Sequence, residues 1–245
     1  MGSAVTYFEI CAADDAPLVA FYDKLFGWEL REPNDGGCTV IDTQGGTGVN
    51  GAICESHPGT VFYVEVDDLH ATLDHACALG GAAPSGPTGN RAMVSDPDGL
   101  LVGLIQVASV PEPTAGAGEP ATWFEVMGAD AARTQQFYAD LFGWTVDRSF
   151  PAYGAVDTGA GRGIMGGLGG GVRSRWATVY AKVADVAQVL RRVGELGGSP
   201  VTDLSVPGLK SEARAALYGS AGTMTTGAFL DPAGNIFGVF DYGNR

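Results

Sequence analysis

The stretch FYDKLFGW at residues 21–28 decides the fold, because FYADLFGW at 137–144 repeats it. Six of the eight positions are identical, and the copies lie 116 residues apart. The same offset relates Phe8-Glu9-Ile10 to Phe124-Glu125-Val126. Similarity at a fixed offset is the signature of a repeated structural unit. The chain is therefore expected to hold two homologous domains.

Further motifs place the ends of these domains. DPDG at 96–99 and DPAG at 231–234 match at an offset of 135, so the second copy carries an insertion of about 18 residues before that motif, around 203–222. This insertion could form a lid or a dimer contact, and the sequence does not choose between them. A stretch rich in Pro, Gly and Ala separates the copies. We expect domain 1 over 1–107, a linker over 108–122, and domain 2 over 123–245.

Hydrophobic spacing predicts the elements inside each domain. Apolar residues from Leu18 to Phe26 recur every three to four positions and stop at Gly27, which is typical of an amphipathic helix with a glycine after its end. Similar helices are expected after Asp68, Asp130 and Asp185, and an alternating strand precedes each of the four. These strands cover Val5–Cys11, Val61–Val66, Thr122–Met127 and Thr178–Val183. Short segments broken by Gly and Pro follow, so the unit is strand–helix–strand–strand–strand, twice per domain.

Charge and cysteine content exclude several function classes. The 245 residues include 14 Lys+Arg and 28 Asp+Glu, a net charge of −14, which disfavours nucleic acid and anionic membranes as partners. The sequence has neither an apolar run of spanning length nor a basic, apolar leader, so we expect a cytoplasmic protein. Four cysteines without a CxxC pair are expected to be free buried thiols in a reducing compartment.

With its opening strand, FY-x-x-LFGW and DPxG, the chain resembles the vicinal oxygen chelate superfamily. That superfamily includes glyoxalase I, bleomycin-resistance proteins and extradiol dioxygenases, and the sequence is most similar to its tandem-domain actinobacterial members labelled glyoxalase-like or hydroxylase. The resemblance implies an α+β fold of two tandem glyoxalase-like domains, each built of two βαβββ units that form curved mixed sheets around a cavity.

The resemblance also implies where a divalent ion would bind, but the residue types there are wrong. In metal-binding members His, Gln or Glu side chains come from fixed strand positions. Here those positions hold Tyr7 and Trp123, Val61 and Thr178, Gly103 and Gly238, and Gly51 or Gly167. The three histidines, His57, His70 and His75, fall in an expected turn and helix and are expected to be exposed. We therefore expect no metal and no cofactor.

Strand alternation indicates which residues line the cavities instead. Because successive side chains point to opposite faces, Phe8 and Ile10 are expected to face the helix and their neighbours the cavity. The expected ligand-binding residues are Tyr7, Tyr63 and Glu65 in domain 1, and Trp123, Met127, Tyr180 and Lys182 in domain 2, with Met93, Ser95 and Met224 as weaker candidates. Glu9 and Glu125 are the candidate catalytic carboxylates, with Glu125 placed near Lys182. Alternatively, these side chains simply fill each barrel, and the two glutamates share a structural bond to backbone.

Three functions remain open from the sequence. The favoured one is metal-independent binding of a small aromatic or polar organic molecule, a secondary metabolite or antibiotic, by resistance or sequestration. The second is a metal-independent tailoring enzyme, in which a carboxylate held against apolar walls serves as general base. The third is a metal-dependent lyase, dioxygenase or hydroxylase. The expected assembly is a monomer with an internal pseudo-dimer, or a homodimer.

The glycine-rich stretch at 159–171 contains a literal GxGxxG at Gly161, Gly163 and Gly166. More glycines follow in place of a helix, so the nucleotide-binding context is missing. We expect a hairpin near the cavity.

Overall fold

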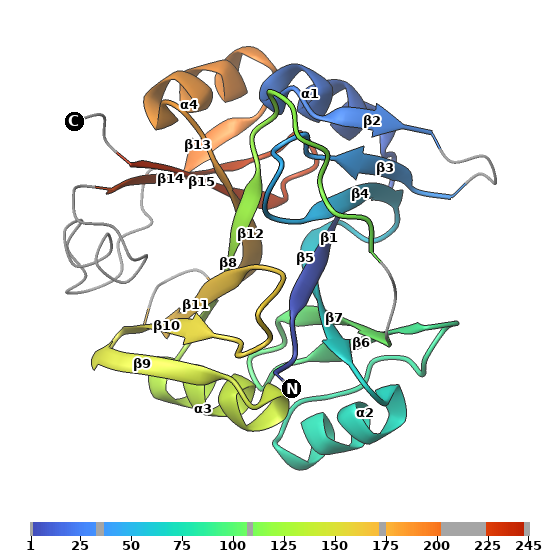
Figure 1. Ribbon diagram of the computed structural model, residues 1–245, viewed down its shortest axis with the longest axis vertical. Helices are drawn as coiled ribbons and strands as arrows, with labels where there is room; N and C mark the ends of the chain where they lie inside the picture. Colours follow the sequence, from blue (N-terminus) through green and yellow to red (C-terminus); the bar gives the residue numbers. More distant parts are fainter. Residues whose placement is uncertain (1, 33–36, 107–109, 172–174, 202–223, 243–245) are drawn as a thin grey trace.

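The computed structural model describes residues 2–32, 37–106, 110–171, 175–201 and 224–242 (Figure 1). The insertion expected around 203–222 lies outside these residues. The first half of the chain contains β1 (Val5–Ala12), α1 (Ala16–Phe26), β2 (Glu29–Arg31), β3 (Thr39–Asp42), β4 (Asn50–Glu55), β5 (Gly59–Val66), α2 (Leu69–Ala78), β6 (Arg91–Ser95) and β7 (Leu101–Gln106). The second half contains β8 (Ala121–Gly128), α3 (Ala131–Phe142), β9 (Thr145–Phe150), β10 (Tyr153–Asp157), β11 (Met165–Gly170), β12 (Trp176–Lys182), α4 (Val186–Glu195), β13 (Ser199–Val201), β14 (Met224–Leu230) and β15 (Ile236–Tyr242).

Each half forms one mixed sheet. The first sheet has the order β2-β3-β4-β1-β5-β7-β6, and the second has the order β13-β14-β15-β12-β8-β11-β10-β9. In the first sheet β1 pairs parallel with β4 and antiparallel with β5; in the second, β8 pairs in the same way with β11 and β12. The expected α+β fold with two related sheets is confirmed.

The repeated motif forms equivalent helices in both halves. Phe21 and Tyr22 of α1, like Phe137 and Tyr138 of α3, are buried on the apolar stripe. Each helix ends at a glycine in the left-handed conformation, Gly27 with φ 65° and Gly143 with φ 69°, which a residue with a Cβ adopts only with strain.

The second unit of the first half differs in its described strands. There β5 and α2 are followed by β6 and β7, whereas α1, α3 and α4 are each followed by three strands. Ala82, at the position equivalent to Ser199 of β13, makes only an isolated bridge to Ser95. The first sheet consequently has seven strands and the second has eight.

The two sheets share one hydrophobic core between their helix-bearing faces. Phe8 and Ile10 of β1 belong to the same buried cluster as Phe124 of β8. The Phe62 and Phe124 rings lie 4.8 Å apart between their centroids. In Figure 1 the central strands run side by side, with α1 and α4 together at one end and α2 and α3 at the other. The opposite faces of the sheets therefore point away from this shared core.

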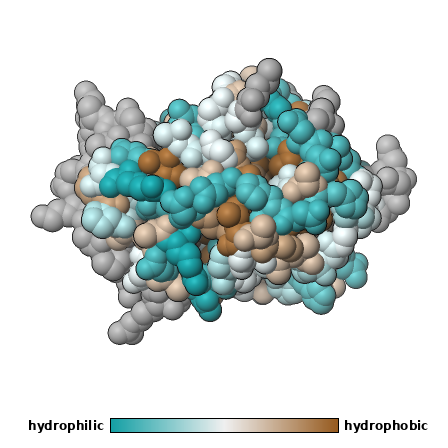
Figure 2. All heavy atoms as spheres, turned by 90° about the horizontal axis from the view of Figure 1, so that it is seen from below, coloured by the Kyte–Doolittle hydropathy of each residue, from teal (hydrophilic) through white to brown (hydrophobic). Residues whose placement is uncertain are grey.

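The described surface carries few large apolar side chains. Val40, Leu101, Met165 and Leu230 are the large hydrophobic residues that the described ranges expose. On the α2–α3 end of the molecule, hydrophobic residues are interspersed with hydrophilic ones (Figure 2). In the part of the chain that the structure describes, no helix combines the length and apolarity needed to cross a membrane.

Candidate functional site

The face of the first sheet that points away from the shared core, here called the first outer face, gathers Tyr7, Glu9 and Cys11 of β1 with Tyr63 of β5. Tyr7 and Cys11 pack in clusters separate from the main core, as strand alternation predicts. Glu9 is only 8% exposed. Its Oε2 accepts a hydrogen bond from the Tyr63 hydroxyl at 2.6 Å, and its Oε1 forms an ion pair with Arg91.

Arg91 is a member of this cluster that the sequence analysis missed. Its guanidinium carbon lies 5.0 Å from the centre of the Tyr7 ring and 5.1 Å from that of Tyr63, which are cation–π distances. Burial raises the pKa of Tyr63, and the negative charge of Glu9 raises it further. The signal was present in the sequence: Met93 and Ser95 were assigned inward by alternation, and Arg91 is the next residue of that series on β6.

The cysteines correct one expectation. Cys38 and Cys54 form a disulfide instead of remaining free thiols, because the antiparallel pairing of β3 with β4 brings them opposite each other. Cys11 is free and buried beside them, and burial raises its pKa to about 12 with a further contribution from Glu9. Cys77 on α2 is free but exposed.

The corresponding face of the second sheet, here called the second outer face, is packed with large side chains. Trp123, Met127 and Tyr180, all expected there, are each at most 3% exposed. The Trp123 indole donates to the Tyr153 hydroxyl at 3.3 Å. Further rings complete the lining: Trp176 packs with Met127, and Phe240 packs with Trp123.

Glu125 lies within this aromatic lining and is 1% exposed. Its Oε2 accepts hydrogen bonds from the Tyr180 hydroxyl at 2.5 Å and from the Trp176 indole at 3.1 Å. Among the described residues its Oε1 has no hydrogen-bond partner. Lys182, expected beside Glu125, is instead exposed, with its ammonium 5.3 Å from the centre of the Tyr242 ring.

The residues at the superfamily's metal positions do not fit a divalent ion. A Cβ at Gly103 would lie 2.4 Å from the Tyr63 ring, and one at Gly238 would lie 2.2 Å from the Tyr180 ring. Tyrosine rings therefore fill the space where ligand side chains would stand. The Thr178 hydroxyl already donates to the Ile236 carbonyl at 2.7 Å. His57, His70 and His75 are exposed on a turn and on α2.

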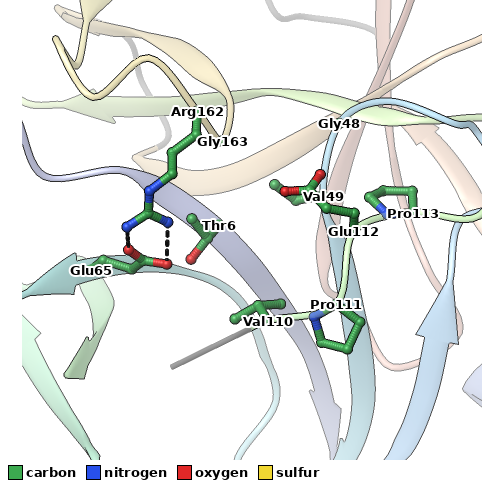
Figure 3. Close-up of a pocket in the computed structure, with 10 residues that line it drawn as sticks. All are labelled: Thr6, Gly48, Val49, Glu65, Val110, Pro111, Glu112, Pro113, Arg162 and Gly163. Carbon is green, nitrogen blue, oxygen red and sulfur yellow. Dashed lines mark hydrogen bonds and ion pairs between the residues drawn. The ribbon is translucent and has the colours of Figure 1, made fainter. Parts of the chain in front are cut away.

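A cavity of about 330 Å³ opens beside the first outer face (Figure 3). Glu65 at the end of β5 and Arg162 from the loop before β11 form an ion pair on one side of it. Val110 lines the cavity and also packs against the cluster of Tyr7 and Tyr63. The full lining is Thr6, Gly48, Val49, Glu65, Val110, Pro111, Glu112, Pro113, Arg162 and Gly163.

Thr6 has an unusual place in this cavity. The register of β1 against β5 shifts between Val5 and Tyr7, so Thr6 sits in a bulge, a feature that re-aims a side chain. Its hydroxyl is buried and has no hydrogen-bond partner among the described residues. In Figure 3 it lies between the Glu65–Arg162 pair and Val110.

The loop expected from the GxGxxG stretch borders the same cavity. Gly161 and Gly163 have positive φ, and β11 follows them where a nucleotide-binding motif requires a helix. Gly163 approaches β1 so closely that a Cβ there would lie 2.2 Å from the Val5 carbonyl oxygen. The glycine therefore permits the contact between the halves that positions Arg162.

The sequence and the structure were compared with those of known proteins. No family model matches the sequence. A protein described as anthracycline biosynthesis protein DnrV, from Streptomyces peucetius, is 25% identical over 231 residues, covering 80% of this chain and 82% of that protein.

Among solved structures, a Mn(II)-bound glyoxalase from Novosphingobium aromaticivorans matches with a TM-score of 0.62 and 18% identity over 98% of this chain and 83% of that one. Homoprotocatechuate 2,3-dioxygenase from Arthrobacter globiformis matches with a TM-score of 0.63 and 18% identity over 100% and 82%. The chain therefore has the two-domain fold of the vicinal oxygen chelate superfamily, to which glyoxalases and extradiol dioxygenases belong.

Proposed function

We propose that this chain binds a small aromatic or polar organic molecule, a secondary metabolite, without a metal ion and by sequestration, in the cavity beside the first outer face. Its volume of about 330 Å³ falls in the range of small-molecule sites. The similarity to a protein of anthracycline biosynthesis supports a secondary metabolite as the class of ligand. The donor set at the superfamily's metal positions supports binding without an ion.

The Thr6 hydroxyl carries the proposal. A buried polar group without a partner costs about 1–3 kcal/mol, and among the described residues both Thr6 and Thr122 carry such a hydroxyl; Thr6 differs in that it lines the cavity. The Thr6 hydroxyl has less than 1 Å² of accessible surface, so a ligand with a hydroxyl, carbonyl or amine would supply the missing hydrogen bond after a rotation of the Thr6 side chain toward the cavity. Glu65 is neutralised by Arg162, while Glu112 adds an exposed negative charge to the lining. This balance favours neutral or cationic ligands.

Titration with an anthracycline, followed by the ligand's own fluorescence in a buffer containing a chelator, tests the proposal. Thr6→Val keeps the side-chain shape but removes the hydroxyl, so affinity should fall about five- to tenfold, the value of one hydrogen bond. The free protein should not lose stability, because no described residue forms a hydrogen bond with this hydroxyl.

Thr122→Val is the matched control. Thr122 occupies the equivalent position 116 residues later, its buried hydroxyl likewise has no partner in the described part of the chain, and it does not line the cavity. Its replacement should leave affinity unchanged. Equal affinity of Thr6→Val and the unchanged chain, or binding that the chelator abolishes, would overturn the proposal.

A second candidate, a metal-independent tailoring enzyme, is favoured by Glu125. Each oxygen of Glu9 already has one partner, Tyr63 or Arg91, whereas one oxygen of Glu125 has no partner among the described residues. Because Glu125 is 1% exposed, a substrate would reach this oxygen only when the surrounding rings move apart, and the carboxylate could then accept a proton from it. Under this candidate, Glu125→Gln abolishes time-dependent conversion of the anthracycline while Glu9→Gln retains it. Absence of any conversion by the unchanged chain leaves sequestration as the function.

A further inference from the structure

Glu9, Cys38 and Cys54 form a cluster on the first outer face that neither the superfamily positions nor the proposed ligand cavity uses. One carboxylate oxygen and the two sulfur atoms all lie within 4.8 Å of one another. We propose that reduction of the Cys38–Cys54 disulfide converts this cluster into a binding site for one zinc ion, with two thiolates and the Glu9 carboxylate as ligands. The disulfide and the metal site are then two alternative states of the same residues.

The strands bring these ligands together. Thr39 pairs with Ile53 across β3 and β4, which sets Cys38 opposite Cys54 with their Cα atoms 4.4 Å apart. A spacing near 4.5 Å is that of a non-hydrogen-bonded antiparallel pair, whose side chains lie close together. Glu9 enters from β1, which pairs parallel with β4 so that Cys11 is level with Cys54. Strand pairing of β1, β3 and β4 positions Glu9 and Cys54 without the disulfide, and Cys38 directly precedes β3, so we expect the three groups to stay close after reduction.

The ligand types suit zinc. Zinc binds thiolate sulfur and carboxylate oxygen in a tetrahedron and prefers sulfur-containing sets of this kind. The fourth position remains for water or for the neighbouring Cys11 thiol, which packs in the same cluster. Cys54 is 5% exposed, but Cys38 is only half-buried, so an ion has a path from solvent.

The charges also balance. Two thiolates neutralise the doubly charged ion. The negative charge of Glu9 is already neutralised by Arg91, so the site as a whole has no net charge. Arg91 and the Tyr63 hydroxyl hold the Glu9 carboxylate in place, as outer groups hold metal ligands in other proteins. The site lies two residues along β1 from Tyr7, the position that the superfamily uses, so it is a different site on the same strand.

The conversion requires an external reductant. A dithiol donates two electrons and two protons to the sulfur–sulfur bond, which breaks into the Cys38 and Cys54 thiols while the dithiol closes into a cyclic disulfide. Zinc then displaces one proton from each thiol, and these protons go to the buffer. Reoxidation by a disulfide reagent reverses the sequence and expels the ion.

Cobalt(II) titration of the full chain tests the proposal, since thiolate ligation of cobalt gives a near-ultraviolet charge-transfer band. The protein is reduced with dithiothreitol, freed of reductant by gel filtration without oxygen, and titrated with cobalt and then with zinc. The reduced chain should bind one equivalent of cobalt, show the band, and lose it when zinc is added. The same chain with its disulfide intact, which needs no mutation, should show no band.

Variants separate the proposed ligands from the other cysteines. Cys38→Ser and Cys54→Ser should each lose the band, and Cys77→Ser, which alters an exposed cysteine outside the cluster, should retain it. Glu9→Gln removes a direct ligand and should weaken cobalt affinity by at least about 10- to 100-fold. That range is the loss found when a group that only orients a ligand is removed. Circular dichroism of each variant verifies its fold. The proposal fails if the reduced chain gives no band, or if the band persists in Cys38→Ser or in the oxidised chain.

Discussion

Glu9 and Glu125 stand at equivalent positions of the two halves, yet their carboxylates are held differently. Glu9 divides its oxygens between Tyr63 and Arg91, whereas Glu125 bonds both of its donors, Trp176 and Tyr180, through one oxygen. Glu9 therefore has a positively charged partner, whereas the donors to Glu125 are both neutral. Duplication has therefore preserved the position of the carboxylate and changed its electrostatic surroundings.

At the residue scale, the Tyr63 hydroxyl is expected to matter for stability. Tyr63→Phe removes the donor to a nearly buried carboxylate, so the free energy of unfolding should fall by about 1.5–3 kcal/mol, the value for a hydrogen bond to a charged group. Urea denaturation measures this loss. Tyr7→Phe removes a hydroxyl that interacts with the partly exposed Arg91 and not with the buried carboxylate, so this control should lose less. A loss for Tyr7→Phe as large as that for Tyr63→Phe would contradict this account.

The sequence predicts the sheet face on which a side chain lies, because alternation along a strand determines it, but it does not predict contacts between distant segments. Tyr7, Tyr63 and Trp123 lie on the faces that alternation assigns to them. Arg162 and the disulfide could not be found this way, because each joins segments whose contact depends on pairing between distant strands. The expected approach of Lys182 to Glu125 is not seen, because Lys182 stands at the end of β12, where its long side chain lies over Tyr242 and turns to solvent.

At the scale of elements, the two repeated motifs of the sequence meet each other. Asp231 of the DPAG turn accepts backbone N–H groups of its own turn through one oxygen and the Tyr22 hydroxyl of α1, at 3.2 Å, through the other. In the same way, a carboxylate oxygen of Asp96 in DPDG accepts a hydrogen bond from the Tyr138 hydroxyl of α3 at 3.3 Å. Each helix motif thus contacts the turn of the opposite half. The sequence shows both motifs but not this exchange, which depends on how the sheets pack.

These contacts between helix and turn should contribute to stability independently. Tyr22→Phe and Tyr138→Phe should each lower the free energy of unfolding by about 1 kcal/mol. This is less than is usual for a hydrogen bond to a carboxylate, because both bonds are long. The losses should add in the double variant, since α1 and α3 lie at opposite ends of the molecule (Figure 1). Guanidinium denaturation of all three proteins provides the measurement. A double variant no less stable than either single one would refute the independence.

The same two tyrosines predict how stability depends on alkaline pH. Burial, with the adjacent aspartates, raises the pKa of Tyr22 and of Tyr138 well above the ordinary value. The unfolded chain ionises its tyrosines near pH 10, before the folded chain does. Their contribution is therefore complete below that pH and is lost as pH rises above it. Urea midpoints from about pH 8 to 11 should fall less steeply for the Tyr22→Phe/Tyr138→Phe variant; equal slopes would exclude this origin.

At the scale of the whole molecule, the halves are related by reciprocal contacts. The Trp28 indole donates to the Glu119 carbonyl at 2.7 Å, and the Trp144 indole donates to the Ser3 carbonyl at 2.8 Å. Donor and acceptor in one pair are each 116 residues from their counterparts in the other. Together with the exchanged tyrosines and the shared core, this makes the chain an internal counterpart of a symmetric dimer.

This reciprocity predicts the behaviour of the first half alone. Residues 1–107 contain both members of each exchanged contact, Tyr22 with Asp96 and Trp28 with Ser3, so two copies can reproduce the interface between the halves. A single copy would expose core residues such as Phe8 and Phe62 and should not fold stably. Sedimentation and circular dichroism over a range of concentrations should therefore show a folded dimer that unfolds on dilution. Tyr22→Phe in this fragment should shift the transition to higher concentration, since each dimer would lose two of the exchanged bonds. A fragment that stays folded as a monomer, or that is unfolded at every concentration, would contradict the view that the shared core and its reciprocal contacts hold the halves together.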